Sequence, residues 1–171
     1  MTRKVLITGA SSDIGIAVCR LYLDNKCRVT GFYNKGQPGL TTLDKEYPEL
    51  TLHQLDFESP KNIESFIEER EGEFLENEIF IHAAALMEPT PFFDITADNL
   101  LRAFTINVIP SFLFTRTLIP AMIERGWGRV VNLSSIGVKF GGGSKTFCYS
   151  LSKHALEFFP SDHKNWASKN V

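Results

Sequence analysis

Short apolar runs rich in β-branched residues alternate along the chain with longer segments of helical spacing. This alternation is typical of βαβ units, which build a parallel sheet covered by helices. Strands are predicted at residues 4–8, 27–33, 50–55, 78–82 and 129–133. We interpret the fifth run, with Val130, Val131 and Leu133, as continuously apolar in character, so we expect it to be covered on both faces.

Helical spacing first appears after the opening strand, where apolar positions recur at intervals of three and four. The recurring residues are Ile14, Ala17, Val18, Leu21 and Tyr22. A further helix is predicted to begin at Pro60, with Ile63, Phe66 and Ile67 on one face. Both patterns indicate helices that pack one face against a sheet.

The second half of the chain contains the most apolar segment. A long helix is predicted over Ala97–Arg125, and Pro110 and Pro120 should kink or divide it. Its arginines and prolines make it a poor membrane span, so we interpret it as a helix packed within the protein. A last helix is predicted to begin near Tyr149, and Pro160 argues for a break inside it.

Composition favours one globular domain, residues 1–171, with no nucleic-acid or membrane partner. The chain has 171 residues, 43% of them hydrophobic, and a net charge of -2 from 18 basic and 20 acidic side chains. Three cysteines without a Cys-x-x-Cys pair favour reduced thiols and a cytoplasmic location. The four histidines lack the spacing of metal ligands, so no metal site is expected.

A small-residue turn, Thr-Gly-Ala-Ser-Ser-Asp-Ile-Gly, occupies residues 8–15 between the first strand and the first helix. Unpaired N–H groups and the positive end of the helix dipole attract an anion at such a turn. A plain structural turn is the alternative, but the position between a strand and an amphipathic helix favours dinucleotide binding. The predicted contacts in this turn are Gly9, Ser11, Ser12, Asp13, Ile14 and Gly15.

The end of the second strand indicates which dinucleotide is bound. An acid at this place accepts hydrogen bonds from the ribose 2′-OH of NAD. Here the chain reads Tyr33-Asn34-Lys35, without an acid. Because the Lys35 cation can pair with a 2′-phosphate, NADP is favoured over NAD. A solvated loop lysine is the alternative.

Residues of four further types, Tyr, Lys, Ser and Asn, suggest proton-transfer chemistry. Tyr149 and Lys153 are four residues apart and therefore share a helix face. The fifth strand ends in Ser134 and Ser135, at the edge where open α/β sheets bind ligands. Asn107 precedes a proline in the long helix, where a kink would free a backbone carbonyl.

This combination of turn, Asn, Ser, Tyr and Lys resembles the short-chain dehydrogenases/reductases, in particular 3-oxoacyl-carrier-protein reductases. The resemblance covers essentially the whole chain. It implies a three-layer α/β Rossmann fold with a parallel sheet in the order 3-2-1-4-5. Strands 6 and 7 and the substrate-covering loop of the family would be absent, so we expect a truncated chain, forming a homodimer or homotetramer when full length.

The resemblance also implies a role for each of these residues. Tyr149 would be the acid in reduction and the base in oxidation, because a nearby ammonium at Lys153 favours the phenolate. Lys153 would also hydrogen-bond the nicotinamide ribose, and Asn107 would anchor a water connecting Lys153 to solvent. Ser135, chosen over Ser134, would hold the substrate oxygen.

Two segments depart from the family pattern. Asp13 replaces the middle glycine of the turn, and its carboxylate would repel a pyrophosphate unless it points outward or caps the helix. His82-Ala83-Ala84-Ala85 replaces Asn-Asn-Ala-Gly, and His82 could replace the first Asn as a hydrogen-bonding strut. The further cofactor contacts implied are Asn34, Lys35, Asp56, Phe57, Ala83, Ala84, Tyr149 and Lys153.

The sequence thus predicts an NADP-dependent oxidoreductase that transfers a hydride between the cofactor and a small carbonyl or alcohol substrate. A truncated chain need not be active by itself. The alternative is a non-catalytic dinucleotide-binding or interaction protein, suggested by Asp13, the altered His82 segment and the short length. A sugar-nucleotide epimerase of the extended group fits less well, because the long C-terminal substrate domain of that group is missing. Retention of all four catalytic residue types favours the enzyme.

Overall fold

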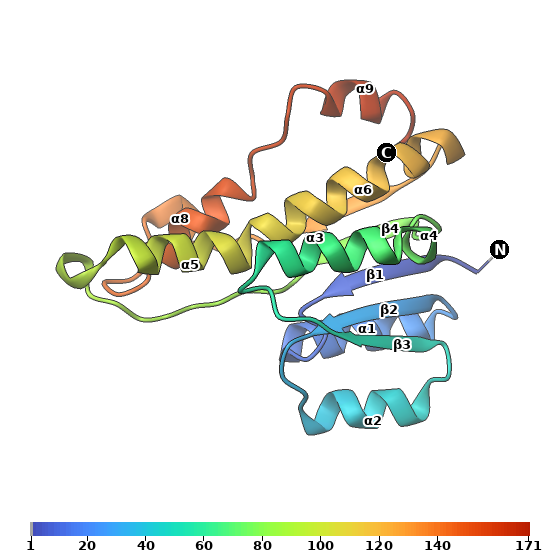
Figure 1. Ribbon diagram of the computed structural model, residues 1–171, viewed down its shortest axis with the longest axis horizontal. Coiled ribbons are helices and arrows are strands. Elements are labelled where there is room, and N and C mark those ends of the chain that lie inside the picture. The colour runs from blue at the N-terminus through green and yellow to red at the C-terminus, as the bar shows by residue number, and fades with distance from the viewer. Residues whose placement is uncertain (1) are drawn as a thin grey trace.

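Five parallel strands form the middle layer of the structure (Figure 1). The computed structural model describes residues 2–171. The strands are β1 (Lys4–Thr8), β2 (Arg28–Tyr33), β3 (Leu50–Gln54), β4 (Ile79–His82) and β5 (Arg129–Asn132). Their order, β3-β2-β1-β4-β5, confirms the predicted three-layer α/β fold.

The first strand lies in the middle of the sheet, so its side chains are buried on both faces. Leu6 belongs to the apolar cluster on one face, and Val5 and Ile7 belong to the cluster on the other. Strands buried in this way are continuously apolar, which is why the sequence pattern located β1 correctly.

Two helices, α1 (Asp13–Asp24) and α2 (Pro38–Glu46), cover one face of the sheet. The buried side of α1 is the narrow stripe Gly15, Cys19 and Leu23, because the helix lies close to the sheet at its glycine. The broader apolar stripe that the spacing suggests is therefore only partly buried. Three of its residues are exposed: Ile14, Ala17 and Leu21.

The opposite face is covered by α3 (Pro60–Glu69), α4 (Glu71–Phe74) and α6 (Ile109–Arg125). Aromatic rings fill the space beneath them: Phe114 lies 5.0 Å from Phe32 and 5.6 Å from Phe80, measured between ring centroids. Phe114 is fully buried, so α6 is packed against the sheet through this ring.

The segment Ala97–Arg125 is long and apolar enough to cross a membrane by length and composition alone. It forms two helices, α5 (Ala97–Asn107) and α6, which meet at Val108. The predicted division therefore occurs two residues before Pro110. Pro120, in contrast, lies inside α6 without interrupting it, because its exposed position leaves the carbonyl it cannot pair open to water. The buried residues of α6 pack into the core.

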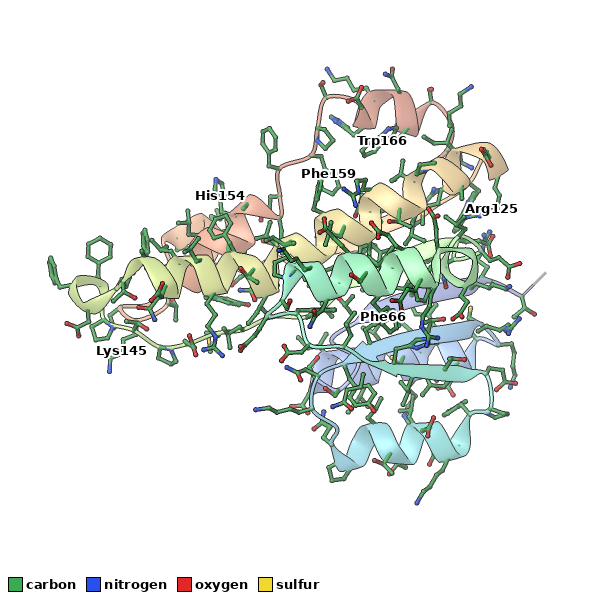
Figure 2. The ribbon with its side chains drawn as sticks, in the orientation of Figure 1. Phe66, Arg125, Lys145, His154, Phe159 and Trp166 are labelled. Atoms are coloured by element: carbon green, nitrogen blue, oxygen red, sulfur yellow. The ribbon has the colours of Figure 1, made fainter. Side chains whose placement is uncertain are left out.

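The C-terminal region contains α7 (Gly137–Phe140), α8 (Phe147–Ala155) and α9 (His163–Ala167). A 3₁₀ turn, η1 (Phe92–Asp94), precedes α5. The last long helix thus begins two residues earlier than predicted and ends before Pro160. The chain then returns over α6, with Phe159 and Trp166 on this returning segment (Figure 2).

The prediction that both faces of the fifth strand are covered is wrong. β5 is one of the two edge strands, and Val131 is 41% exposed because the apolar cluster beneath α1 and α2 includes residues of β1 to β4 but none of β5. Val130, on the other face, packs against the aromatic cluster. Near the start of β5, the Gly128 N–H donates to the Asn170 carbonyl at 3.2 Å.

Candidate active site

The turn after β1 has the geometry of an anion-binding loop. Gly9 has a φ of 72°, and a Cβ there would lie 2.6 Å from the Ala84 nitrogen, so only glycine fits between the two loops. Ser12 caps α1 by accepting a hydrogen bond from the Gly15 N–H at 3.0 Å. Within residues 2–171, no group accepts a hydrogen bond from the Asp13 and Ile14 amides. These two donors point out of the positive end of a twelve-residue helix.

A cleft of about 490 Å³ opens beside this turn, at the carboxyl ends of the central strands. It lies where open α/β sheets bind nucleotides. Ten of the residues predicted to bind the cofactor line it: Gly9, Ser11, Ser12, Ile14, Asn34, Lys35, Asp56, Phe57, Ala83 and Ala84.

The remaining predicted cofactor contacts lie elsewhere. Asp13 is exposed on α1 and does not line the cleft, so its carboxylate points outward, one of the two orientations compatible with a pyrophosphate. Gly15 is buried behind the turn, where a Cβ would lie 2.0 Å from the Gly9 carbonyl oxygen. Tyr149 and Lys153 are on α8, outside the cleft lining.

One rim of the cleft carries charged side chains. The Asn34 amide donates to the Asp56 carboxylate at 3.1 Å, and Lys35 next to it is exposed. Arg102 on α5 forms ion pairs with Glu58, at 2.5 Å, and with Glu88. This cluster was not predicted from the sequence, because its three members come from two separate loops and a helix.

On α8, Lys153 is 2% exposed and lies beside Tyr149. Its ammonium is 5.8 Å from the centroid of the tyrosine ring and donates to the Leu133 carbonyl at 2.8 Å. Burial lowers the pKa of Lys153 to about 8, because the charged form loses hydration. The predicted Tyr–Lys pair therefore shares a helix face, and its lysine is deeply buried.

The two serines after β5 point to different partners. The Ser134 hydroxyl donates to the Glu157 carboxylate at 2.5 Å. The Ser135 hydroxyl accepts from the Gly137 N–H at 3.1 Å. A Cβ on Gly137 would lie 3.4 Å from the Ser135 oxygen and 2.7 Å from the Ser150 oxygen, which places Ser135 close to α8.

Asn107, fully buried at the end of α5, connects several segments. Its side-chain oxygen accepts from the Leu86 N–H at 2.6 Å, and its amide donates to the Leu86 carbonyl and, at 2.8 Å, to Ser152. The Ser152 hydroxyl donates in turn to the Tyr149 carbonyl at 2.7 Å. Asn107 is thereby linked to the helix of Tyr149 and Lys153 through Ser152, a residue that sequence reasoning missed.

The Asn107 backbone carbonyl is freed by the break between α5 and α6, but it has a protein partner. His82 Nε2 lies 2.8 Å from this oxygen, and His82 Nδ1 lies 2.7 Å from the Thr8 hydroxyl. Burial is the main cause that lowers the pKa of His82 to about 4. The hydrogen bond to Asn107 raises this pKa, and the Lys153 charge lowers it. His82 therefore serves as a neutral hydrogen-bonding strut.

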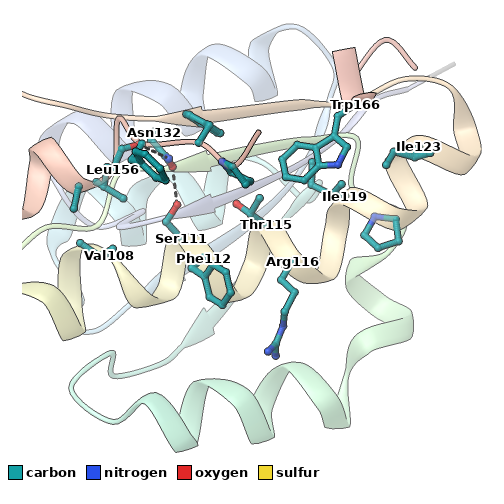
Figure 3. Close-up of a pocket in the computed structure, with 15 residues that line it drawn as sticks. Val108, Ser111, Phe112, Thr115, Arg116, Ile119, Ile123, Asn132, Leu156 and Trp166 are labelled. Atoms are coloured by element: carbon teal, nitrogen blue, oxygen red, sulfur yellow. Dashed lines mark hydrogen bonds between the residues drawn. The ribbon is translucent and has the colours of Figure 1, made fainter. Parts of the chain in front are cut away.

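A second and larger cavity, about 660 Å³, lies between α6, β5 and the segment after α8 (Figure 3). Its walls are mainly apolar, and the Ser111 hydroxyl in it already donates to Asn132 at 2.7 Å. Arg116 points away from the labelled aromatic Trp166 (Figure 3). Tyr149 and Lys153 do not line this second cavity. Among the described residues, no group of three His, Cys, Asp or Glu side chains could hold a metal ion.

The five-stranded parallel sheet and the turn after β1 define a Rossmann-type α/β protein, and comparison with known proteins identifies the family. The chain matches the short-chain dehydrogenase family over residues 3–171 and belongs to it. It is 28% identical over 178 residues to "Dehydrogenase/reductase SDR family protein 7-like" of Drosophila melanogaster, covering 99% of this chain and 54% of the relative. It is 24% identical over 158 residues to a ketoacyl reductase of Nostoc sp., covering 90% of this chain and 54% of the relative.

Solved structures agree with this assignment. A short-chain dehydrogenase from Streptomyces avermitilis superimposes with a TM-score of 0.88 at 26% identity, covering 100% of this chain and 63% of that chain. This chain therefore spans between about half and two thirds of the length of these relatives.

Proposed function

We propose that this protein is an NADP-dependent oxidoreductase that interconverts a small carbonyl compound and its alcohol. The observation that supports this most directly is Lys153, a buried amine with a lowered pKa beside a tyrosine on the same helix face. Burying an amine is costly for folding, and strongly shifted groups of this kind concentrate at functional sites.

The described residues fit a dinucleotide. The free backbone amides of Asp13 and Ile14 suit a pyrophosphate. Gly9 lies against the backbone of Ala84 with no side chain between the two loops. Phe57 and Ala83 contribute apolar surface to the cleft. When bound, the nicotinamide supplies the hydride that the side chains of the protein cannot provide.

The chain's own residues would move the proton. In the reducing direction, carbonyl, NADPH and one proton give alcohol and NADP⁺. Tyr149 would donate its phenolic proton to the carbonyl oxygen as the hydride reaches the carbon, and the Lys153 ammonium would stabilise the phenolate left behind. Ser135 would hold the substrate oxygen. The phenolate then regains a proton from solvent.

The preference for NADP rests on the rim of the cleft. Asn34 and Lys35 line it directly after β2, and Lys35 is exposed and able to approach a 2′-phosphate. Arg102 is already neutralised by two carboxylates, so Lys35 is the better partner for the added charge. As substrates we propose 3-oxoacyl compounds, which the ketoacyl reductase resemblance suggests.

The test is a titration of NADPH and NADH, followed through cofactor fluorescence, with the wild type and Lys35→Ala. We expect tighter binding of NADPH, weakened about fivefold to tenfold in Lys35→Ala while NADH binding is unchanged, as for an exposed ion pair of about 1 kcal/mol. Equal affinity for both cofactors would contradict the NADP assignment.

A second assay separates an enzyme from a non-catalytic binding protein. Turnover of a 3-oxoacyl thioester with NADPH should be abolished in Tyr149→Phe, with cofactor affinity retained. NADPH binding by a wild type that turns over no carbonyl substrate would favour the binding protein.

A further inference from the structure

His82 is a buried titratable residue that the proposed reaction does not use. Its side chain is fully buried at the end of β4, and both ring nitrogens have partners on other elements. The groups facing it are the Thr8 hydroxyl on β1, the Asn107 carbonyl on α5 and the Phe80 ring. Lys153 is the charged group that acts on it.

These partners fix one form of the imidazole. A backbone carbonyl only accepts hydrogen bonds, so His82 Nε2 must carry the proton that it donates to Asn107. The neutral ring then has a bare Nδ1, which accepts from the Thr8 hydroxyl. Thr8 also accepts from the Ala84 N–H at 3.4 Å, so every donor in the chain of bonds has an acceptor.

The same chain of bonds continues to the candidate catalytic helix. His82 holds the backbone carbonyl of Asn107 at the point where α5 ends, and the Asn107 amide holds Ser152. Ser152 lies between Tyr149 and Lys153 on α8 and bonds to the Tyr149 carbonyl. A displacement of Asn107 would therefore be passed to the helix that carries both residues.

We propose that His82 is a positioning residue of the proposed reaction: as the Nε2–H tautomer it holds Asn107, and through Asn107 and Ser152 it sets the position of Tyr149 and Lys153. The inference rests on the proposed function for its catalytic consequence. The arrangement also assigns the Asn107 carbonyl to His82, whereas the Lys153 ammonium is held by the Leu133 carbonyl.

The test compares the wild type with His82→Leu, which removes both hydrogen bonds, and His82→Asn, which keeps one donor and one acceptor. His163→Leu is the matched control, because His163 is exposed on α9 and outside this set of bonds. The first measurement is the ¹⁵N NMR spectrum of the imidazoles. The second is the pKa of Lys153 by NMR of the labelled amine, and the third is the split between kcat and KM.

We expect a neutral Nε2–H ring for His82 at pH 7. In His82→Leu the Lys153 pKa should rise by at least one unit, because water reaches an amine on a loosened helix, with His82→Asn between the two and His163→Leu unchanged. Turnover should fall at least tenfold in His82→Leu, with KM and NADPH affinity within twofold of the wild type. An Nδ1–H tautomer would overturn the proposal. So would a folded His82→Leu variant with unchanged Lys153 pKa and kcat.

Failure of the proposed function gives a different result. If the wild type neither binds NADPH nor reduces a carbonyl, but Lys153 still responds to His82→Leu and not to His163→Leu, the enzymatic assignment fails and the positioning of Lys153 by His82 stands. If NADPH binds and turnover is normal in His82→Leu, the positioning role fails and the function stands.

Discussion

Replacing Gly9 by alanine tests whether the turn after β1 is fixed by its contact with the loop after β4. Gly9 and Gly126 have nearly the same backbone conformation, with φ values of 72° and 70°. A Cβ at Gly126 meets nothing within 4 Å, whereas one at Gly9 would lie 2.6 to 2.8 Å from three backbone atoms of Ala83 and Ala84. The two substitutions share the cost of left-handed backbone and differ in the steric clash.

Left-handed alanine costs about 1–2 kcal/mol, so Gly126→Ala should lower the free energy of unfolding by about that amount. Gly9→Ala adds the displacement of a loop backbone, for which overpacking costs of about 1–3 kcal/mol are typical. We therefore expect Gly9→Ala to be the more destabilising by about 2 kcal/mol.

Urea unfolding monitored by circular dichroism measures both values under one set of conditions. The cofactor titration adds a second comparison: Gly9→Ala should lose NADPH binding, whereas Gly126→Ala, at the far end of α6, should retain it. Equal destabilisation by the two substitutions, within about 0.5 kcal/mol, would refute the steric argument.

Three other predictions follow from buried groups. The pKa of His82 is about 4 in the folded protein and about 6.5 when unfolded. The stability that neutral His82 contributes to the folded protein is therefore fully present above pH 6.5 and is lost as the pH falls towards 4. Unfolding free energy should therefore fall by about 3 kcal/mol more in the wild type than in His82→Asn over that range, and parallel curves would contradict this. Phe114→Ala should cost about 3–5 kcal/mol in urea unfolding, and Phe93→Ala, at a side chain 96% exposed, less than about 0.5 kcal/mol. Burial raises the pKa of Cys19 to about 12, so a disulfide reagent at pH 8 should modify it only after denaturation, and rapid native labelling would disprove its burial.

Much of the fold could be predicted because it depends on local pattern. The limits of β1 match the prediction, since a strand buried on both faces is a continuous apolar run bounded by polar residues. The helix α2 was missed, because only Leu40 and Leu43 are buried in it and the surrounding sequence is polar. The exposed face of β5 could not be anticipated either, because the composition of a strand does not say how far the neighbouring helices extend.

The candidate site divides in the same way. The residues of the turn from Gly9 to Gly15 are consecutive, and Tyr149 and Lys153 are only four positions apart. The spacing within each motif therefore suggests its chemistry. The bonds that join Thr8, His82 and Asn107 connect residues 25 or more positions apart, and no periodicity encodes such partners. His82 was expected to be a strut, but the acceptor that it holds became evident only in the folded structure.

The contact of Gly9 with Ala84 also bears on how sequences of this kind diverge. Part of the wall of the cleft is main chain, and main chain keeps its shape whenever small residues occupy a few positions. Most other side chains can then change without altering the surface offered to a nucleotide, which is consistent with a TM-score of 0.88 at only 26% identity. Distant members of such a lineage are therefore better recognised by the placement of their smallest residues than by overall identity.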